Sequence, residues 1–150
     1  MKKILLAFFL IFTLFLCSCG ANGISEGDML YDCGAKRIGN VEKFEFLYEE
    51  YTEYSGEKLQ ITDKEDQELF KHYKYLSDFP GNRMHEIYTY PSNTFTFTID
   101  GEAYSFFLHE DGSLTSLLNP NFSKHKTYQA DEKYRITPEK LDELIDKYGK

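Results

Sequence analysis

The sequence contains no tryptophan, only three cysteines, and only 17 basic residues against 25 acidic ones. A surplus of acidic side chains repels nucleic acid and other polyanions, so this composition disfavours nucleic-acid binding. Basic peptides and basic protein surfaces remain compatible with the charge, although a high net charge commonly serves only solubility.

Short motifs that identify common catalytic or phosphate-binding sites are also missing. The sequence has no Gly-x-Ser-x-Gly elbow for serine catalysis, no phosphate-binding glycine loop and no His-Glu-x-x-His helix. Asp100-Gly101 and Asp111-Gly112 do not open the ladder of acidic residues that a calcium loop requires, so we interpret both as hairpin turns.

One apolar run is present at the N-terminus. Lys2 and Lys3 precede an almost wholly apolar stretch from Ile4 to Leu16. A positive start followed by a short apolar run is typical of a secretory signal peptide. The run is shorter than the roughly 20 residues of a comfortable membrane span.

The run ends in Leu16-Cys17-Ser18-Cys19, which resembles the lipobox of bacterial lipoproteins, an aliphatic residue three positions before a cysteine. The resemblance implies a signal peptide over 1–18 and a diacylglycerol on Cys19, the new N-terminus. The protein would then be lipid-anchored on the extracytoplasmic face of the cell membrane. Removal of Lys2 and Lys3 leaves 15 basic and 25 acidic side chains, a net charge of −10.

After the lipidated cysteine, residues 19–40 are rich in glycine and poor in apolar periodicity, so we predict a flexible tether. With Cys17 removed and Cys19 acylated, Cys33 has no intramolecular partner. We expect an unpaired thiol in the tether, able to cross-link copies of the chain. No disulfide framework then stabilises the domain at 41–150, so its core must.

The stretch 41–54 is ambiguous between helix and strand. Phe44, Leu47, Tyr48 and Tyr51 fit one face of a helix, whereas Phe44, Phe46 and Tyr48 fit one face of a strand. The aromatic content of 17% favours strands, and a Ser-Gly turn follows. The hairpin interpretation is therefore preferred, with strands near 42–50 and 57–61.

A helix is predicted next, because Thr62 and Glu65 have the spacing of a capping box. Its apolar stripe comprises Leu69, Phe70, Tyr73 and Leu76, and the segment 79–82, Phe-Pro-Gly-Asn, ends it. A second helix is predicted at the C-terminus, with Thr137 as the cap, Pro138 in the first turn, and an apolar stripe of Leu141, Leu144, Ile145 and Tyr148.

Between these helices lies a predicted β-meander that begins with strands at 84–90 and 94–99. Asp100-Gly101 is a strong two-residue hairpin signal, and that register places Phe97 opposite Tyr104 and Phe95 opposite Phe106. The register agrees with the alternation of apolar residues along 94–99.

At Asp111-Gly112 the register stays open. A two-residue loop places Phe106 opposite Leu117, and a one-residue slip pairs Leu108 with Leu114. Residues 119–130 are predicted to form a loop, followed by a short edge strand around 134–136.

Together these elements give an α+β fold in which an antiparallel β-meander carries two helices on one face, in the order β-β-α-β-β-β-β-α. This order, and the Ile-Thr-Asp start of the first helix at Ile61, loosely resembles small YhfM-like lipoprotein domains of Gram-positive bacteria. Domains of that kind have mostly unassigned roles.

The pairs His85-Glu86 and His109-Glu110 are the first candidates for a catalytic or metal site. Both are predicted on strands, where adjacent side chains point to opposite faces, so neither pair can easily serve one site. A nucleophilic Cys33 would need a histidine beside it, which a tether does not supply. We therefore predict no catalytic residue, no metal and no cofactor.

A surplus of tyrosine suggests a contact surface instead, because tyrosine is large, stiff and amphipathic. An acidic run over 42–57 could attract a basic partner to the same region. Packing within the core is an equally weighted explanation for the tyrosines. The predicted partner-binding face comprises Tyr48, Tyr51, Tyr54, Tyr88, Tyr90 and Tyr104.

The sequence thus favours a membrane-anchored extracytoplasmic binding module for a protein or peptide with a basic surface. Two alternatives are an envelope-acting hydrolase built from His and Glu residues gathered by the fold, and an inhibitor or immunity lipoprotein that masks a cationic partner.

Overall fold

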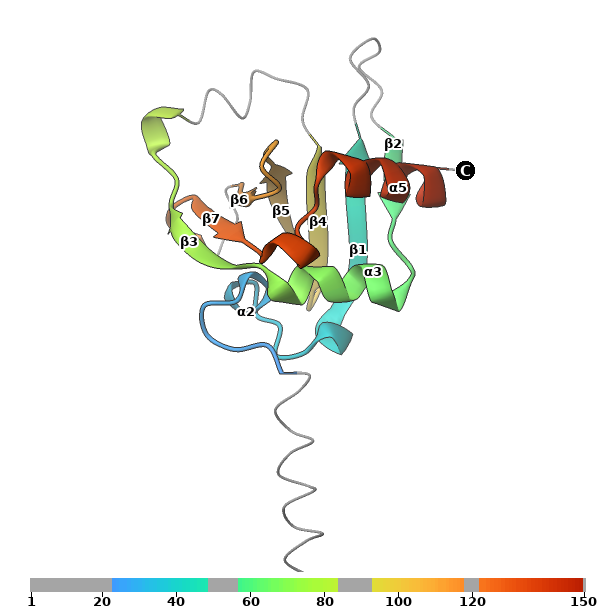
Figure 1. Cartoon of the computed structure of the whole chain (residues 1–150). Helices are drawn as coiled ribbons and strands as arrows, with labels where there is room; N and C mark the ends of the chain where they lie inside the picture. Colours follow the sequence, from blue (N-terminus) through green and yellow to red (C-terminus); the bar gives the residue numbers. More distant parts are fainter. Residues whose placement is uncertain (1–22, 49–56, 84–92, 118–121, 150) are drawn as a thin grey trace, which may run out of the picture.

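The computed structural model describes residues 23–48, 57–83, 93–117 and 122–149 (Figure 1). It confirms the α+β class, since one seven-stranded antiparallel sheet carries helices packed on it. The strand order across the sheet is β2-β1-β4-β5-β6-β7-β3. The strands are β1 (Val41–Tyr48), β2 (Glu57–Gln60), β3 (Lys74–Asp78), β4 (Thr94–Ile99), β5 (Glu102–Leu108), β6 (Leu114–Ser116) and β7 (Lys126–Gln129).

Helices α3 and α5 lie across the front of the sheet in Figure 1, while α2 lies at the lower end, where the described chain begins. The α-helices are α2 (Met29–Asp32), α3 (Lys64–Glu68) and α5 (Pro138–Tyr148). Short 3-10 helices are η1 (Ile38–Asn40), η2 (Leu69–His72), η3 (Gly81–Arg83) and η4 (Glu132–Tyr134). Within the described stretches, no helix has the length and apolar composition that a membrane span requires.

The hairpin interpretation of residues 41–61 is confirmed, because β1 and β2 pair antiparallel with Phe46 opposite Leu59. The β4–β5 hairpin has the predicted register, with Phe97 opposite Tyr104 and Phe95 opposite Phe106. Asp100 and Gly101 both have positive φ, +51° and +79°, as a type I′ turn requires. A two-residue turn of this type therefore sets the register locally.

The core lies between the sheet and the helices. Phe70 of η2 is fully buried and packs against Phe44, Phe95 and Phe97 of the sheet, with ring centroids 5.9, 5.1 and 4.9 Å away. Leu144 of α5 is also buried in this cluster. These aromatic contacts pack η2 against the sheet.

The first predicted helix is too long. Asp63, not Thr62, caps α3, because the Asp63 carboxylate accepts a hydrogen bond from the Glu65 N–H at 2.9 Å. The α-helix ends at Glu68, and residues 74–78 form edge strand β3, which leaves Leu76 56% exposed. Residues 74–78 form a strand because their backbone pairs with β7, which is distant in the sequence. The local sequence pattern does not predict this pairing.

Two further predictions in the C-terminal third are wrong. Part of the predicted loop at 119–130 is strand β7, in which Tyr128 is fully buried and faces Leu114 of β6. The predicted edge strand at 134–136 is replaced by η4 and an extended residue that leads into α5. In the sheet, β7 lies between β6 and β3. The strand predicted at 84–90 lies outside the described residues.

Residues 23–40 are not a tether. Met29 and Leu30 of α2 are fully buried, and the Met29 N–H donates to the Tyr73 carbonyl at 2.8 Å. Cys33 is 1% exposed, and burial, followed by the neighbouring Asp32 charge, raises its thiol pKa. The prediction of an accessible, cross-linking thiol is therefore wrong, because α2 turns Cys33 into the core.

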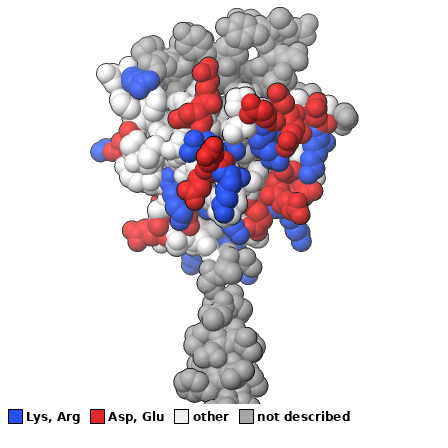
Figure 2. Space-filling model, in the orientation of Figure 1, with Lys and Arg blue, Asp and Glu red and all other residues white. Residues whose placement is uncertain are grey.

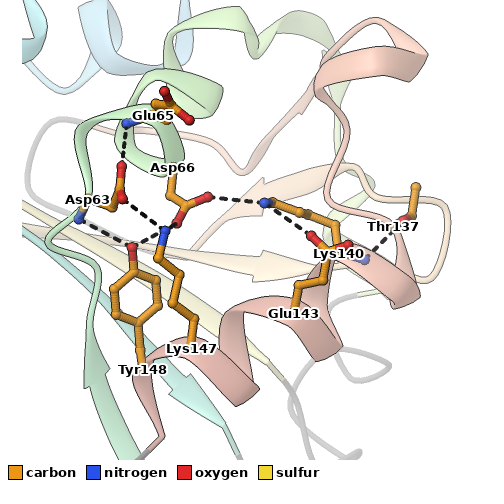
Figure 3. Close-up of polar contacts among 8 residues, drawn as sticks. All are labelled: Asp63, Glu65, Asp66, Thr137, Lys140, Glu143, Lys147 and Tyr148. Carbon is orange, nitrogen blue, oxygen red and sulfur yellow. Dashed lines mark hydrogen bonds and ion pairs between the residues drawn. The ribbon is translucent and has the colours of Figure 1, made fainter.

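Charges of both signs are interspersed over α3 and α5 on the face shown in Figure 2. Their contacts are drawn in Figure 3, where Asp66 of α3 meets three groups of α5. The Asp66 carboxylate accepts from Lys140 at 3.0 Å, and from Lys147 and the Tyr148 hydroxyl at 2.7 Å each. Asp66 is 5% exposed, so these partners are what permit its burial, and the cluster clamps α5 onto α3.

Candidate functional site

Two neighbouring recesses open at the end of β5, and His109 and Glu110 line both of them. We call the first, of about 440 Å³, the polar recess; its walls also include Phe79, Arg83, Asp111, Ser113 and Thr127. We call the second, of about 220 Å³, the apolar recess; its other walls are Asn93, Leu108, Ile136, Pro138 and Leu141. The pair forms the candidate site.

The β5–β6 turn sets the position of His109, and its register is the second of the two that the sequence left open. Leu108 faces Leu114, and Phe106 faces Ser116 instead of Leu117. The His109 N–H donates to the Ser113 carbonyl at 2.9 Å, which leaves residues 110–112 as the loop. In such a three-residue loop the last position is left-handed, and Gly112 has φ +79°.

Glu110 is the first residue of this loop, and His109 directly precedes it. The alternation of side chains along a strand, which would point the two to opposite faces, therefore does not apply to them. The prediction that the pair cannot serve one site is therefore wrong: both residues line the same recesses. The sequence does contain a signal for this arrangement, which is the glycine two residues after Glu110. Interpreted as the last residue of a three-residue loop, Gly112 would have placed His109 and Glu110 at one site.

Tyr73 ties the β5–β6 turn to the segment before α5. Its hydroxyl donates to the Gly112 carbonyl and accepts from the Ile136 N–H, both at 2.9 Å. The side chain is fully buried, and this burial raises the pKa of Tyr73 to about 12. The hydroxyl thus stays protonated and ties the loop after β5 to the segment that enters α5.

The His109 ring is fixed by contacts on several sides. Its Nε2 lies 2.7 Å from the Thr115 hydroxyl, which lies 2.9 Å from the Thr127 hydroxyl on the next strand. The ring packs edge-on to Phe107, with centroids 4.8 Å apart, and tilted against Phe79 at 5.7 Å. These contacts hold the His109 ring in one orientation where it lines both recesses.

Asp111 contributes a fixed negative charge at the mouth of the polar recess. Its Oδ1 accepts from the Ser113 N–H at 2.9 Å and from the Ser113 hydroxyl at 2.6 Å. Burial by itself would raise the pKa of Asp111, but these hydrogen bonds outweigh it and the pKa lies below its ordinary value. With the exposed Glu110, Asp111 gives the polar recess two carboxylates against one guanidinium, that of Arg83.

Asn93 contributes an unpaired acceptor to the apolar recess. Its Oδ1 is buried, and no donor among the described residues reaches it. Leu108, Ile136 and Leu141 supply the apolar walls around it. A buried carbonyl oxygen without a donor is rare in folded proteins and calls for a specific explanation, of which a ligand is one.

Of the six tyrosines in the predicted binding face, only Tyr104 has a described side chain, and it does not lie on the surface. Tyr104 is 3% exposed and packs edge-on against Phe122 with centroids 6.3 Å apart, so it belongs to the core. Its position opposite Phe97 explains this, since alternate residues of β5 face the helices. Of Tyr48 only the backbone, in β1, is described; the four other predicted tyrosines, with Cys19 and His85, lie outside the described residues: Tyr51, Tyr54, Tyr88 and Tyr90.

The other described histidines do not line either recess. His72 stacks on the Tyr134 ring at a centroid distance of 3.5 Å, and burial, then the Lys71 charge, lowers its pKa. His125 Nδ1 lies 2.7 Å from the Ser116 carbonyl. Among the side chains in the described ranges, no three His, Cys, Asp or Glu groups are placed to hold a metal ion together.

No protein-family model, curated protein or solved structure matches this chain.

Proposed function

We propose that the chain is a lipid-anchored extracytoplasmic binding module whose ligand occupies the two recesses beside His109. The lipobox-like Leu16-Cys17-Ser18-Cys19 supports the anchor. The unpaired Asn93 oxygen within apolar walls supports ligand binding, because a donor from a ligand would remove the cost of leaving that oxygen buried and unpaired.

The observation that carries the proposal is that the start of the described chain and the two recesses lie at opposite ends of the sheet. The described chain begins at Gly23, which pairs with Arg37 just before β1 begins, at the lower end of Figure 1. Val41 there faces Ile99, the end of β4 next to the β4–β5 turn, whereas the recesses lie at the far end of β5. From Glu102 to Leu108 the strand covers roughly 20 Å.

A lipid on Cys19 would therefore hold one end of the sheet against the membrane and leave the other free. Three residues lie between Cys19 and Gly23, and the four Cα–Cα steps of this link span at most about 14 Å. The recesses would then face away from the lipid surface, where ligands and partners are accessible.

The anchor is tested by growing cells with labelled palmitate. Wild-type protein and Cys17→Ser are expected to incorporate label, and Cys19→Ser is expected to incorporate none. Cys17→Ser is the matched control, because it removes a neighbouring thiol and keeps a small residue at the middle of the lipobox. Label in Cys19→Ser equal to that in wild type would refute the anchor.

The binding half is tested by filling the apolar recess. Leu141→Trp is expected to reduce capture of ligands from an envelope extract, whereas Leu76→Trp, on the exposed edge strand, is the matched control. Identical capture by both variants and wild type would refute binding at this site.

An envelope-acting hydrolase is the second candidate, favoured by one observation. His109, Glu110 and Asp111 line the same recess, which is the arrangement of a general base with neighbouring carboxylates. Under this alternative His109→Asn abolishes release of soluble products from envelope material, whereas under the binding proposal no such release is detected from any variant.

A further inference from the structure

We propose that the two recesses bind a peptide segment in which an apolar residue stands next to a basic residue. The apolar side chain occupies the apolar recess, and a backbone N–H of the segment donates to Asn93 Oδ1. The basic side chain lies in the polar recess, against Glu110 and Asp111. This inference rests on the proposed function and names the class of ligand for its site.

The size and lining of the apolar recess set the first requirement. Its volume of about 220 Å³ corresponds to about seven water molecules, which suits a branched aliphatic side chain. Leu108, Ile136 and Leu141 offer such a group apolar contact on several sides. Water alone would be held poorly there, since it would find few polar partners.

The unpaired oxygen sets the second requirement, a hydrogen-bond donor close to that apolar group. Asn93 Oδ1 can only accept, and the N terminus of α5, with Pro138 in its first turn, also lines the recess. The partial positive charge of a helix N terminus disfavours a cation at this point. A neutral donor fits better, and the backbone N–H of a peptide is one.

The charges of the polar recess set the third requirement. The Asp111 carboxylate is fixed by Ser113, and Glu110 is exposed beside it. The Arg83 guanidinium lies 5.6 Å from the centroid of the Phe79 ring, and Arg83 is the only arginine or lysine among the described residues that line this recess. Two carboxylates against one guanidinium favour a basic side chain there.

The two recesses adjoin, so one ligand can meet all three requirements. His109 and Glu110 line both recesses, so a group in one recess lies directly beside a group in the other. Neighbouring residues of an extended peptide point to opposite sides, which places an apolar and a basic side chain on either side of the His109 ring. A free amphipathic amine has the apolar and basic parts but lacks the neutral donor between them.

The test measures fluorescence anisotropy of labelled peptides with the full-length chain in lipid nanodiscs. The probes are N-acetylated hexapeptides with a central Leu-Lys, Leu-Glu or Ser-Lys pair in an otherwise Gly-Ser sequence, together with labelled hexylamine. The Leu-Lys peptide is expected to bind most tightly, with the affinity falling as salt rises. Leu-Glu and Ser-Lys peptides are expected to bind at least about tenfold more weakly.

Three variants locate the binding. Asn93→Leu is expected to weaken the Leu-Lys peptide about five- to tenfold, and Glu110→Gln is expected to reduce the salt dependence. Asp142→Asn, on the exposed face of α5, removes the same charge as Glu110→Gln and should change nothing. If Asn93→Leu does not fold, the Glu110→Gln and Leu141→Trp variants decide the question.

Equal binding of Leu-Lys and Leu-Glu peptides, or unchanged binding in Asn93→Leu, would overturn the inference. Binding of hexylamine without any binding of peptide would overturn it too, yet would leave a binding module standing. The palmitate experiment tests only the anchor, and the peptide experiment tests only the kind of ligand. A wrong ligand class can therefore be distinguished from a wrong proposed function.

Discussion

Replacing Gly112 by alanine tests the turn that carries His109. Gly112 and Gly101 are the last residues of two hairpin turns, and both have φ +79°. Their surroundings differ. A Cβ on Gly101 meets nothing within 4 Å, whereas one on Gly112 lies 2.3 Å from Arg135 Cγ and 2.8 Å from the Ile136 carbonyl oxygen. The pair separates the cost of the backbone conformation from the cost of crowding.

The magnitudes follow from this contrast. Gly101→Ala is expected to lower the free energy of unfolding by about 1 kcal/mol, the cost of a left-handed conformation in a residue with a Cβ. Gly112→Ala adds the cost of overpacking, about 2 kcal/mol, for a total of about 3 kcal/mol. Arg135 can move only by losing its two hydrogen bonds to the Ala130 carbonyl, 3.3 and 3.2 Å long.

Thermal unfolding followed by circular dichroism measures the difference. At about 4 °C per kcal/mol for a domain of this size, Tm should fall by about 4 °C in Gly101→Ala and about 12 °C in Gly112→Ala. In an Arg135→Ala background the cost of Gly112→Ala should shrink, because the crowded Cγ and Cδ atoms are gone. Equal losses for the two glycines would refute the reasoning, as would an unchanged cost without the arginine side chain.

Other predictions concern the groups that tie the fold together. Asp66→Asn should lower the free energy of unfolding by about 2 kcal/mol, while Asp142→Asn on the exposed face stays within about 0.5 kcal/mol, as measured by urea unfolding at pH 7. Burial alone would raise the pKa of Asp66, but the hydrogen bonds from Lys147, Tyr148 and Lys140 outweigh it, so the folded pKa lies below the ordinary 3.8. The stability from Asp66 is therefore fully present above pH 3.8 and is lost as the pH falls through the lower folded value; this pH dependence should be missing in Asp66→Asn. Tyr73→Phe leaves the Gly112 carbonyl and the Ile136 N–H unpaired and should cost about 2 kcal/mol in the same assay; a loss below about 0.5 kcal/mol would show that water replaces the hydroxyl. Cys33 should react with a maleimide only after denaturation, since it is buried with a raised thiol pKa, and labelling of the native protein would contradict its place in the core.

The candidate site could be predicted only in part, because some of its features depend on neighbouring residues and others on tertiary packing. The sequence singles out His109-Glu110 as a candidate pair, but the predicted strand places the two side chains on opposite faces. The three-residue loop that brings them together depends on the Asp111–Ser113 hydrogen bonds and on the left-handed Gly112. Asn93 gave no signal in the sequence, because an unpaired buried oxygen exists only once β4, β5 and α5 have packed around it.

The sequence alone determined the features that a few neighbouring residues control. The type I′ turn at Asp100-Gly101 fixed the register of β4 and β5, and Thr137 with Pro138 fixed the start of α5, because turn and cap geometry depend on residues adjacent in the chain. The tertiary structure decided the rest. Residues 74–78 became an edge strand because β7 supplied hydrogen-bonding partners, and Cys33 became a core residue because α2 docks beside Tyr73. Such outcomes depend on partners dozens of residues away, whose contribution to the free energy no local pattern encodes.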